Sequence, residues 1–170
     1  LQQPQAVPAP QKKSMAAGKP ASHGDLTVEG VGNLLTQLAR CCQPVPGDDI
    51  TGYLTKGKGV SIHRSSCASL AYLLLNHPER ALPVSWGSRE DGKYEVSILI
   101  RAYDRKWLLK DLTNIIAQAN VNIVGVNTLS QGGATAELKM NLKVSDFGQL
   151  SMLLGKLDAV PGVMEARRFG

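Results

Sequence analysis

The cysteines constrain this chain more than any other feature of its sequence. All three, Cys41, Cys42 and Cys67, fall in one short stretch, and His63 stands four positions before the last of them. Three thiolates and one imidazole make the four-ligand set that closed structural zinc sites use. Adjacent residues of a strand point to opposite faces, so Cys41 and Cys42 can share an ion only if the chain turns there. The proline- and glycine-rich segment 44–47 provides suitable turn residues.

The same residues are compatible with two other interpretations. Reduced, buried cysteines can pack as small hydrophobic side chains, with His63 bonded to a backbone carbonyl. A cysteine–histidine pair can also act as a nucleophile, but no known nucleophile signature surrounds these residues. Disulfide bonds are disfavoured, because the number of cysteines is odd and two of them are adjacent. Reduced thiols predict a cytoplasmic location.

The first 25 residues differ in composition from the rest of the chain. They contain four prolines and several glutamines and show no apolar periodicity. Such a segment buries too little surface to offset the entropy of ordering. We therefore expect residues 1–25 to form a disordered linker, and the start at Leu1 indicates a fragment of a longer protein. No apolar run reaches the roughly 18 to 20 residues needed to span a bilayer, so we expect no membrane partner.

Charge excludes one class of function. The formal net charge of +5 is spread along the chain without a block of like charge. Binding to nucleic acid that is driven mainly by net charge is therefore not indicated. A folded domain that contacts RNA through a few local basic patches remains compatible with the sequence.

The segment 26–90 predicts a small domain of mixed secondary structure. Apolar residues at three- and four-residue steps predict an amphipathic helix over 31–38. Two short β-type runs, 50–55 and 60–63, are joined by a Lys-Gly-Lys-Gly segment of hairpin length. A small domain buries little apolar surface, and a structural metal ion is a standard remedy.

The second half of this small domain predicts a helix and a further strand. Ser65 or Ser66 can cap a helix that ends near Asn76, before a proline. The run 82–86 predicts one more strand. Cys67 then lies in the first turn of the helix, within reach of His63.

The segment 92–170 predicts a second domain with the element order βαββαβ. Strands are expected at 94–102, 121–129, 136–144 and 163–168, and helices over 108–119 and after Asp146, which is placed as a cap. This order is the ferredoxin-like unit, with two helices on one face of a four-stranded antiparallel sheet. The fold class is therefore α+β. The open sheet face is expected to lack the aromatic side chains that stack RNA bases, and to show Glu95, Ser97, Arg101, Glu137, Lys139, Asn141 and Lys143.

Several motifs carry a resemblance to a known family. They are the run 28–35, the run 39–48 around the adjacent cysteines, and the run 57–67 with its His-Arg-x-x-Cys ending. Together they resemble the C-terminal regulatory region of the RelA/SpoT family of (p)ppGpp synthetases. The ending 160–168 is closer to the RelA branch than to the SpoT branch. The similarity covers about residues 27 to 170.

The resemblance implies a structure for both domains. In that family the cysteine-containing module is a conserved-cysteine or zinc-finger domain, and an ACT domain with a ferredoxin-like fold follows it. Carried over by position, the metal ligands are Cys41, Cys42, His63 and Cys67, and zinc is the expected cofactor. The expected boundaries are 1–25 for the linker, 26–90 for the zinc-finger-like domain and 92–170 for the ACT domain.

The resemblance also implies a function. The fragment is expected to catalyse nothing, while its parent transfers pyrophosphate from ATP to GDP or GTP in the stringent response. The expected partners are ribosomal RNA, uncharged tRNA and the N-terminal catalytic domains of the same protein, and homodimer formation is left open. Lys56, Lys58 and Arg64 are the candidates for RNA contact, because a protruding hairpin can reach into a groove; the commoner role of such residues is that of solvated loop charges.

The chain departs from the family pattern at two places. RelA-like sequences usually have an acidic residue before the last cysteine, where this chain has Ser66. ACT domains that bind amino acids usually have a glycine soon after an Asp-Arg pair, where this chain has Lys106 and Trp107. Two alternative functions therefore stay open. One is an amino-acid-sensing ACT module, against which Trp107 argues, and the other is a zinc- or redox-sensing module that uses the adjacent thiols.

Overall fold

The computed structural model describes residues 28–32, 34–87 and 92–169. Contacts between residues divide the chain into two compact units. The first unit is Leu1–Pro44 with Asp48–Gly92, and the second is Val45–Gly47 with Lys93–Gly170. The predicted linker 1–25 lies outside the described residues. In the described part of the chain, no helix has the length and apolar character needed to cross a bilayer.

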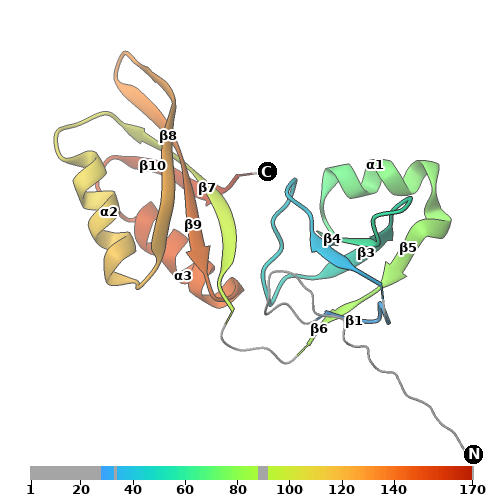
Figure 1. Ribbon diagram of the computed structural model, residues 1–170. Helices are drawn as coiled ribbons and strands as arrows, with labels where there is room; N and C mark the ends of the chain where they lie inside the picture. The colour runs from blue at the N-terminus through green and yellow to red at the C-terminus, as the bar shows by residue number, and fades with distance from the viewer. Residues whose placement is uncertain (1–27, 33, 88–91, 170) are drawn as a thin grey trace, which may run out of the picture. The chain divides into compact units, whose positions relative to one another are not determined.

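The first unit is built on a four-stranded sheet in the order β2-β4-β3-β5 (Figure 1). As predicted, β3 (Ile50–Leu54) and β4 (Val60–Arg64) form an antiparallel hairpin. Its tip needs glycine, because Gly57 and Gly59 have φ values of +91° and +78°. A Cβ added to Gly59 would lie 2.3 Å from the Leu35 carbonyl oxygen.

The helix predicted over 31–38 is wrong. Instead, β2 (Thr36–Leu38) pairs in parallel with β4. Gly30 and Gly32 have positive φ values of +102° and +61°, which are incompatible with a right-handed helix. The apolar spacing was also too short to decide between a helix and a strand, and the free edge of β4 provides the hydrogen bonds that favour the strand.

The helix that follows the hairpin begins differently from the prediction. The helix itself, α1 (Ala68–Asn76), is confirmed, but Cys67 is its N-cap residue, and neither Ser65 nor Ser66 caps it. The Ser65 hydroxyl instead bonds to Thr51 Oγ1 at 2.8 Å, which removes it from the helix end.

The strand predicted over 82–86 is two strands that pair with different partners. A short 3₁₀ helix, η3 (Pro78–Arg80), leads into β5 (Ala81–Pro83), which extends the main sheet beside β3. The next strand, β6 (Ser85–Trp86), pairs with β1 (Val28–Glu29). The Trp86 indole donates to the Asp48 carbonyl oxygen at 3.0 Å.

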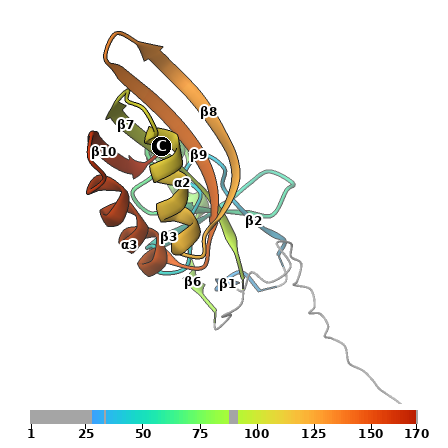
Figure 2. The same ribbon diagram turned by 90° about the vertical axis from the view of Figure 1, so that its left-hand side faces the viewer.

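The second unit has the predicted order βαββαβ. Its antiparallel sheet has the order β10-β7-β9-β8, and both helices cover one face of it (Figures 1 and 2). This is the ferredoxin-like fold. The elements are β7 (Tyr94–Tyr103), α2 (Leu108–Gln118), β8 (Asn122–Gly132), β9 (Thr135–Val144), α3 (Phe147–Asp158) and β10 (Val163–Arg168).

Alternating side chains of the sheet and one face of each helix form the core of the second unit. The predicted cap of α3 is confirmed, because the Asp146 side chain accepts from the Gln149 backbone N–H at 2.8 Å. The largest fully buried side chains in this core are Ile98, Ile100, Leu112, Ile116, Met140, Leu142, Leu150, Leu153 and Leu157.

The open face of this sheet differs from the prediction at Ser97. This residue is buried rather than exposed, and its hydroxyl donates to Asn141 Oδ1 at 2.8 Å. Phe169 continues past β10 and donates its backbone N–H to the Ser97 carbonyl oxygen at 2.9 Å. The Lys139 ammonium lies 4.5 Å from the centre of the Phe169 ring. One aromatic side chain therefore lies next to residues of the open face, where none was expected.

Candidate metal centre

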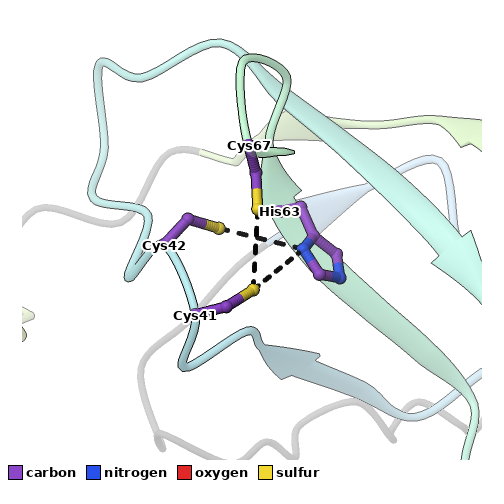
Figure 3. Close-up of side chains that lie close together, drawn as sticks. All are labelled: Cys41, Cys42, His63 and Cys67. Carbon is purple, nitrogen blue, oxygen red and sulfur yellow. Dashed lines mark hydrogen bonds between the residues drawn. The ribbon is translucent and has the colours of Figure 1, made fainter. Parts of the chain in front are cut away.

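Four side chains from three separate parts of the first unit converge on one point (Figure 3). Cys41 and Cys42 come from the turn after β2, His63 from β4, and Cys67 from the N-cap of α1. One ligand atom from each residue lies within 4.8 Å of all the others. The structure thus brings together all four residues that the sequence analysis named as metal ligands.

Three of the distances between these atoms are close to those around a tetrahedral zinc ion. Zinc–sulfur bonds of about 2.3 Å and zinc–nitrogen bonds of about 2.0 Å place two sulfurs about 3.8 Å apart, and a sulfur and a nitrogen about 3.5 Å apart. The Cys41 and Cys67 sulfurs are 3.6 Å apart. His63 Nδ1 is 3.5 Å from Cys41 Sγ and 3.8 Å from Cys42 Sγ. These three distances are compatible with a zinc ion, and all four ligand atoms lie within 4.8 Å of one another.

A backbone turn explains how two adjacent cysteines can face the same point. The strand β2 ends at Leu38, and the Ala39 N–H donates to the Ile62 carbonyl oxygen at 2.9 Å. The chain then turns back, because the Gln43 N–H donates to the Ala39 carbonyl oxygen at 3.1 Å and Gln43 has a φ of +49°. Cys41 and Cys42 therefore lie in a turn and not on a strand, as their use as paired ligands requires.

Arg64 holds this turn from the neighbouring strand. Its backbone N–H donates to Cys42 Sγ at 3.2 Å, and its Nε donates to the Cys42 carbonyl oxygen at 3.0 Å. Hydrogen bonds to a ligating sulfur orient the ligand and offset part of its negative charge. Arg64 is half-buried, so its side chain supports the cysteine turn and is only partly available to an RNA partner.

Burial sets the protonation of the ligand side chains in the absence of an ion. It raises the pKa of the Cys42 thiol to about 12 and also raises the pKa of Cys41. Burial lowers the pKa of His63, so its imidazole is neutral at pH 7. For Cys67 burial acts upward, but the nearby backbone N–H of Leu70 and the neighbouring thiols outweigh it and lower the pKa. The neutral imidazole is ready to bind a cation, whereas most of the thiols must first lose a proton.

The lysines predicted to contact RNA lie at the tip of the β3–β4 hairpin. Lys56 and Lys58 are both exposed there. The sequence analysis missed one further cation near this tip, Arg40. In the structure Arg40 and Lys58 both line a pocket of about 310 Å³, to which His63 also contributes. Only the parallel pairing of β2 with β4 brings Arg40 to this place, and no local pattern in the sequence predicts that pairing.

The second unit has a pocket at the start of α2. It has a volume of about 350 Å³, and its lining includes Arg105, Trp107 and Leu109 together with Thr128 and Leu138 from the sheet. Trp107 has a φ of +68°, a left-handed conformation that favours glycine. Although the side chain is an indole, the backbone thus has the shape expected of a glycine at this loop.

The Trp107 side chain is exposed and lies close to two cations. The Lys106 and Lys110 ammonium groups are 5.6 Å and 5.5 Å from the indole centre. Such cation–π contacts hold an exposed ring against its own helix end. The indole forms part of the pocket wall and is not packed into the core.

Comparison with known proteins assigns each unit to a domain family. Residues 26–87 match the RelA/SpoT RIS domain, and residues 90–168 match the ACT domain. The chain is 40% identical to a GTP pyrophosphokinase of Escherichia coli over 93% of its own length, and 38% identical to one of Haemophilus influenzae over 86%. It spans only about a fifth of those relatives, 21% and 20% of their lengths.

A solved structure is similar to part of this chain. The ACT domain from the GTP pyrophosphokinase of Chlorobium tepidum covers 45% of this chain and 99% of its own length, with 21% identity and a TM-score of 0.41. The two domain matches together account for residues 26–87 and 90–168, in the order that the sequence motifs indicated. The chain therefore belongs to the RelA/SpoT family and is a regulatory region of it, composed of a RIS domain and an ACT domain.

Proposed function

We propose that this chain is a non-catalytic regulatory region of a RelA-type (p)ppGpp synthetase that contacts ribosomal RNA and uncharged tRNA in the cytoplasm. Its parent would transfer pyrophosphate from ATP to GDP or GTP, and the region would restrain the catalytic domains when no ribosome is bound. Membership in the RelA/SpoT family supports this proposal. The proposal divides the region into a zinc-finger-like domain at 26–90 and an ACT domain at 92–170.

A zinc ion held by Cys41, Cys42, His63 and Cys67 is the structural basis of the first domain in this proposal. The ion would join the turn after β2, the strand β4 and the start of α1. These are the parts that determine where the β3–β4 hairpin points. The observation that carries the proposal is the convergence of four ligand atoms within 4.8 Å, in a domain that matches the RelA/SpoT RIS family.

The hairpin tip is the proposed point of contact with RNA. Lys56 and Lys58 are exposed at the tip of the β3–β4 hairpin, and Arg40 and Lys58 line the same pocket. Lysine and arginine side chains bind phosphate oxygens without regard to sequence, which suits recognition of a folded RNA. Arg64, the third candidate for RNA contact, lies at the end of β4 away from the hairpin tip, and its bond to the Cys42 carbonyl oxygen gives it a structural role.

The test is co-sedimentation of the chain with ribosomes, with and without uncharged tRNA. The native chain should bind, and the amount bound should rise when tRNA is present. The variant Lys56→Glu/Lys58→Glu should bind at least about tenfold more weakly, because it reverses two charges at a contact that depends on phosphate. Leaving Arg64 unchanged keeps the cysteine turn intact.

A matched control places the same charge change on the second unit. Lys143 and Lys156 are both exposed, so Lys143→Glu/Lys156→Glu changes net charge equally without touching the hairpin. Binding that falls equally in both variants would show a general charge effect and would contradict a contact at the hairpin. A native chain that retains zinc but does not sediment with ribosomes would contradict the ribosome-binding role itself.

The pocket at the start of α2 supports a second candidate function. Its volume of about 350 Å³ and its mixed lining of Arg105, Asp104 and apolar side chains suit a small amino acid with an apolar side chain. Calorimetric titration with branched-chain amino acids tests this candidate. Stoichiometric binding that is lost in Arg105→Ala would favour amino-acid sensing, and no heat of binding would exclude it at the concentrations used.

A further inference from the structure

His63 has a second hydrogen-bonding atom on the side away from the cysteines. Its Nδ1 faces the sulfurs of Cys41 and Cys42. Its Nε2 lies 3.0 Å from the Ser61 hydroxyl oxygen. Ser61 and His63 are two residues apart on β4, so both side chains point to the same face of the sheet.

The chemistry of imidazole fixes the direction of this hydrogen bond when a cation is bound. A neutral imidazole carries one proton, and Nδ1 can give its lone pair to a metal only if that proton is on Nε2. Nε2–H is then the donor, and the Ser61 oxygen accepts. A partner of this kind selects the tautomer that can bind metal and holds the ring at a fixed angle.

The environment of His63 bears on what holds its imidazole ring in one orientation. The ring is buried, with an exposed fraction of 5%, and both Ser61 and His63 line the pocket of about 310 Å³. A hydrogen bond between Ser61 and Nε2 keeps this nitrogen from turning toward the sulfurs.

We propose that Ser61 is the positioning residue of this metal centre, because its hydroxyl holds His63 in the tautomer and orientation that present Nδ1 to the ion. The proposal rests on the zinc site proposed above. It assigns to Ser61 no direct bond to the ion. Loss of an outer hydrogen bond of this type costs about 10- to 100-fold in metal affinity.

Competition with a zinc chelator of known affinity tests the role of Ser61 on the full chain. Ser61→Ala should bind zinc about 10- to 100-fold more weakly. Ser61→Thr should restore most of the native affinity, because threonine keeps the hydroxyl and is well suited to a strand. Ser85→Ala is the matched control, since it removes an exposed hydroxyl from another strand of the same unit, and its affinity should be native.

A second background separates positioning from general stability. In His63→Cys the fourth ligand is a thiolate, which has no ring to orient, so Ser61→Ala should then have no effect on affinity. A loss of equal size in both backgrounds would overturn the proposal, since it would show that Ser61 acts through the fold. ¹⁵N spectra of the zinc-bound native chain should show the proton of His63 on Nε2.

The outcomes also distinguish this proposal from the zinc site on which it rests. A native chain that binds no zinc would overturn both. Native binding together with unchanged affinity in Ser61→Ala, or with the His63 proton on Nδ1, would overturn the role of Ser61 alone.

Discussion

The two units of this chain reach stability by different routes. The second unit has a continuous aliphatic core made by two helices and alternate residues of four strands. Among the described residues, the first unit has fewer fully buried aliphatic side chains, chiefly Val60, Ile62 and Leu70. One of its buried clusters contains two of the four candidate ligands: Ala39, Cys42, Tyr53, Cys67 and Leu70. Apolar burial can therefore stabilise the second unit without help, whereas the first has polar ligand groups where a larger domain would have aliphatic side chains.

Removal of the metal should give the largest difference between the two units. A structural zinc ion contributes about 10 to 16 kcal/mol in small zinc domains, which exceeds the stability of most single domains. A strong chelator, or the variant Cys67→Ala, should therefore unfold the first unit and leave the second folded. Hydrogen exchange measures this, with loss of protection in β2 to β5 and full protection in β7 to β10.

The same experiment can contradict the claim that the two units are stabilised differently and unfold independently. If β3 and β4 stay protected after the metal has been removed, apolar packing alone stabilises the first unit. If protection is lost in β7 and β9 as well, the two units do not unfold independently.

A mutation in the core of the second unit should destabilise that unit and leave the first unchanged, with a smaller effect than removal of the metal. Leu112 is fully buried in α2, and Leu112→Ala should lower the free energy of unfolding of the second unit by about 2 to 5 kcal/mol. The metal content of the first unit should not change. Denaturant titration with zinc present measures the loss, and the exposed Leu109 provides the control, because Leu109→Ala should cost much less.

Proton release should report how the first unit prepares its ligands. At pH 7 the raised pKa values keep the thiols of Cys41 and Cys42 protonated, so each of them releases a proton when zinc binds. The pKa of Cys67 is lowered, so this thiol releases less than one proton on average. The neutral His63 releases none. Binding of one zinc ion should therefore release between two and three protons. The affinity should then rise at least about 100-fold per pH unit near neutrality and fall equally on acidification.

Calorimetry in buffers of different ionisation enthalpy counts these protons. Release of one proton or fewer would mean that Cys41 or Cys42 is already a thiolate, contrary to the effect of burial. The second unit should give no heat on addition of zinc.

The smallest effect concerns the strained loop of the second unit. Trp107 has a φ of +68°, and a side chain in the left-handed region costs roughly 1 to 2 kcal/mol. Trp107→Gly and Trp107→Ala both remove the indole, but only glycine removes this cost. The glycine variant should therefore be about 1 kcal/mol more stable than the alanine variant, as measured by thermal unfolding. Equal stability would mean that the loop relaxes without strain.

Local patterns were sufficient to predict the second unit. The alternation from Tyr94 to Ala102, the helical spacing after Leu108 and the cap at Asp146 each reflect contacts between residues close in sequence. The prediction that Ser97 is exposed was wrong, because Ser97 contacts Asn141 and Phe169, which are distant from it in the chain.

The first unit depends more on contacts between distant residues. The strand β2 forms because it pairs with β4, and the apolar spacing of its residues gave no sign of that pairing. The residue types alone identified the four ligands. The choice of Nδ1, the support from Arg64 and the bond to Ser61 could not be predicted, because each depends on how the cysteine turn packs on β4.

The metal content of the purified chain tests the central claim most directly. Native mass spectrometry under reducing conditions should show one zinc ion per chain, and each of the single variants Cys41→Ala, Cys42→Ala, His63→Ala and Cys67→Ala should lose it or bind it far more weakly. A native chain without a metal ion, or full occupancy in any of these variants, would contradict the four-ligand centre on which the account of the first unit depends.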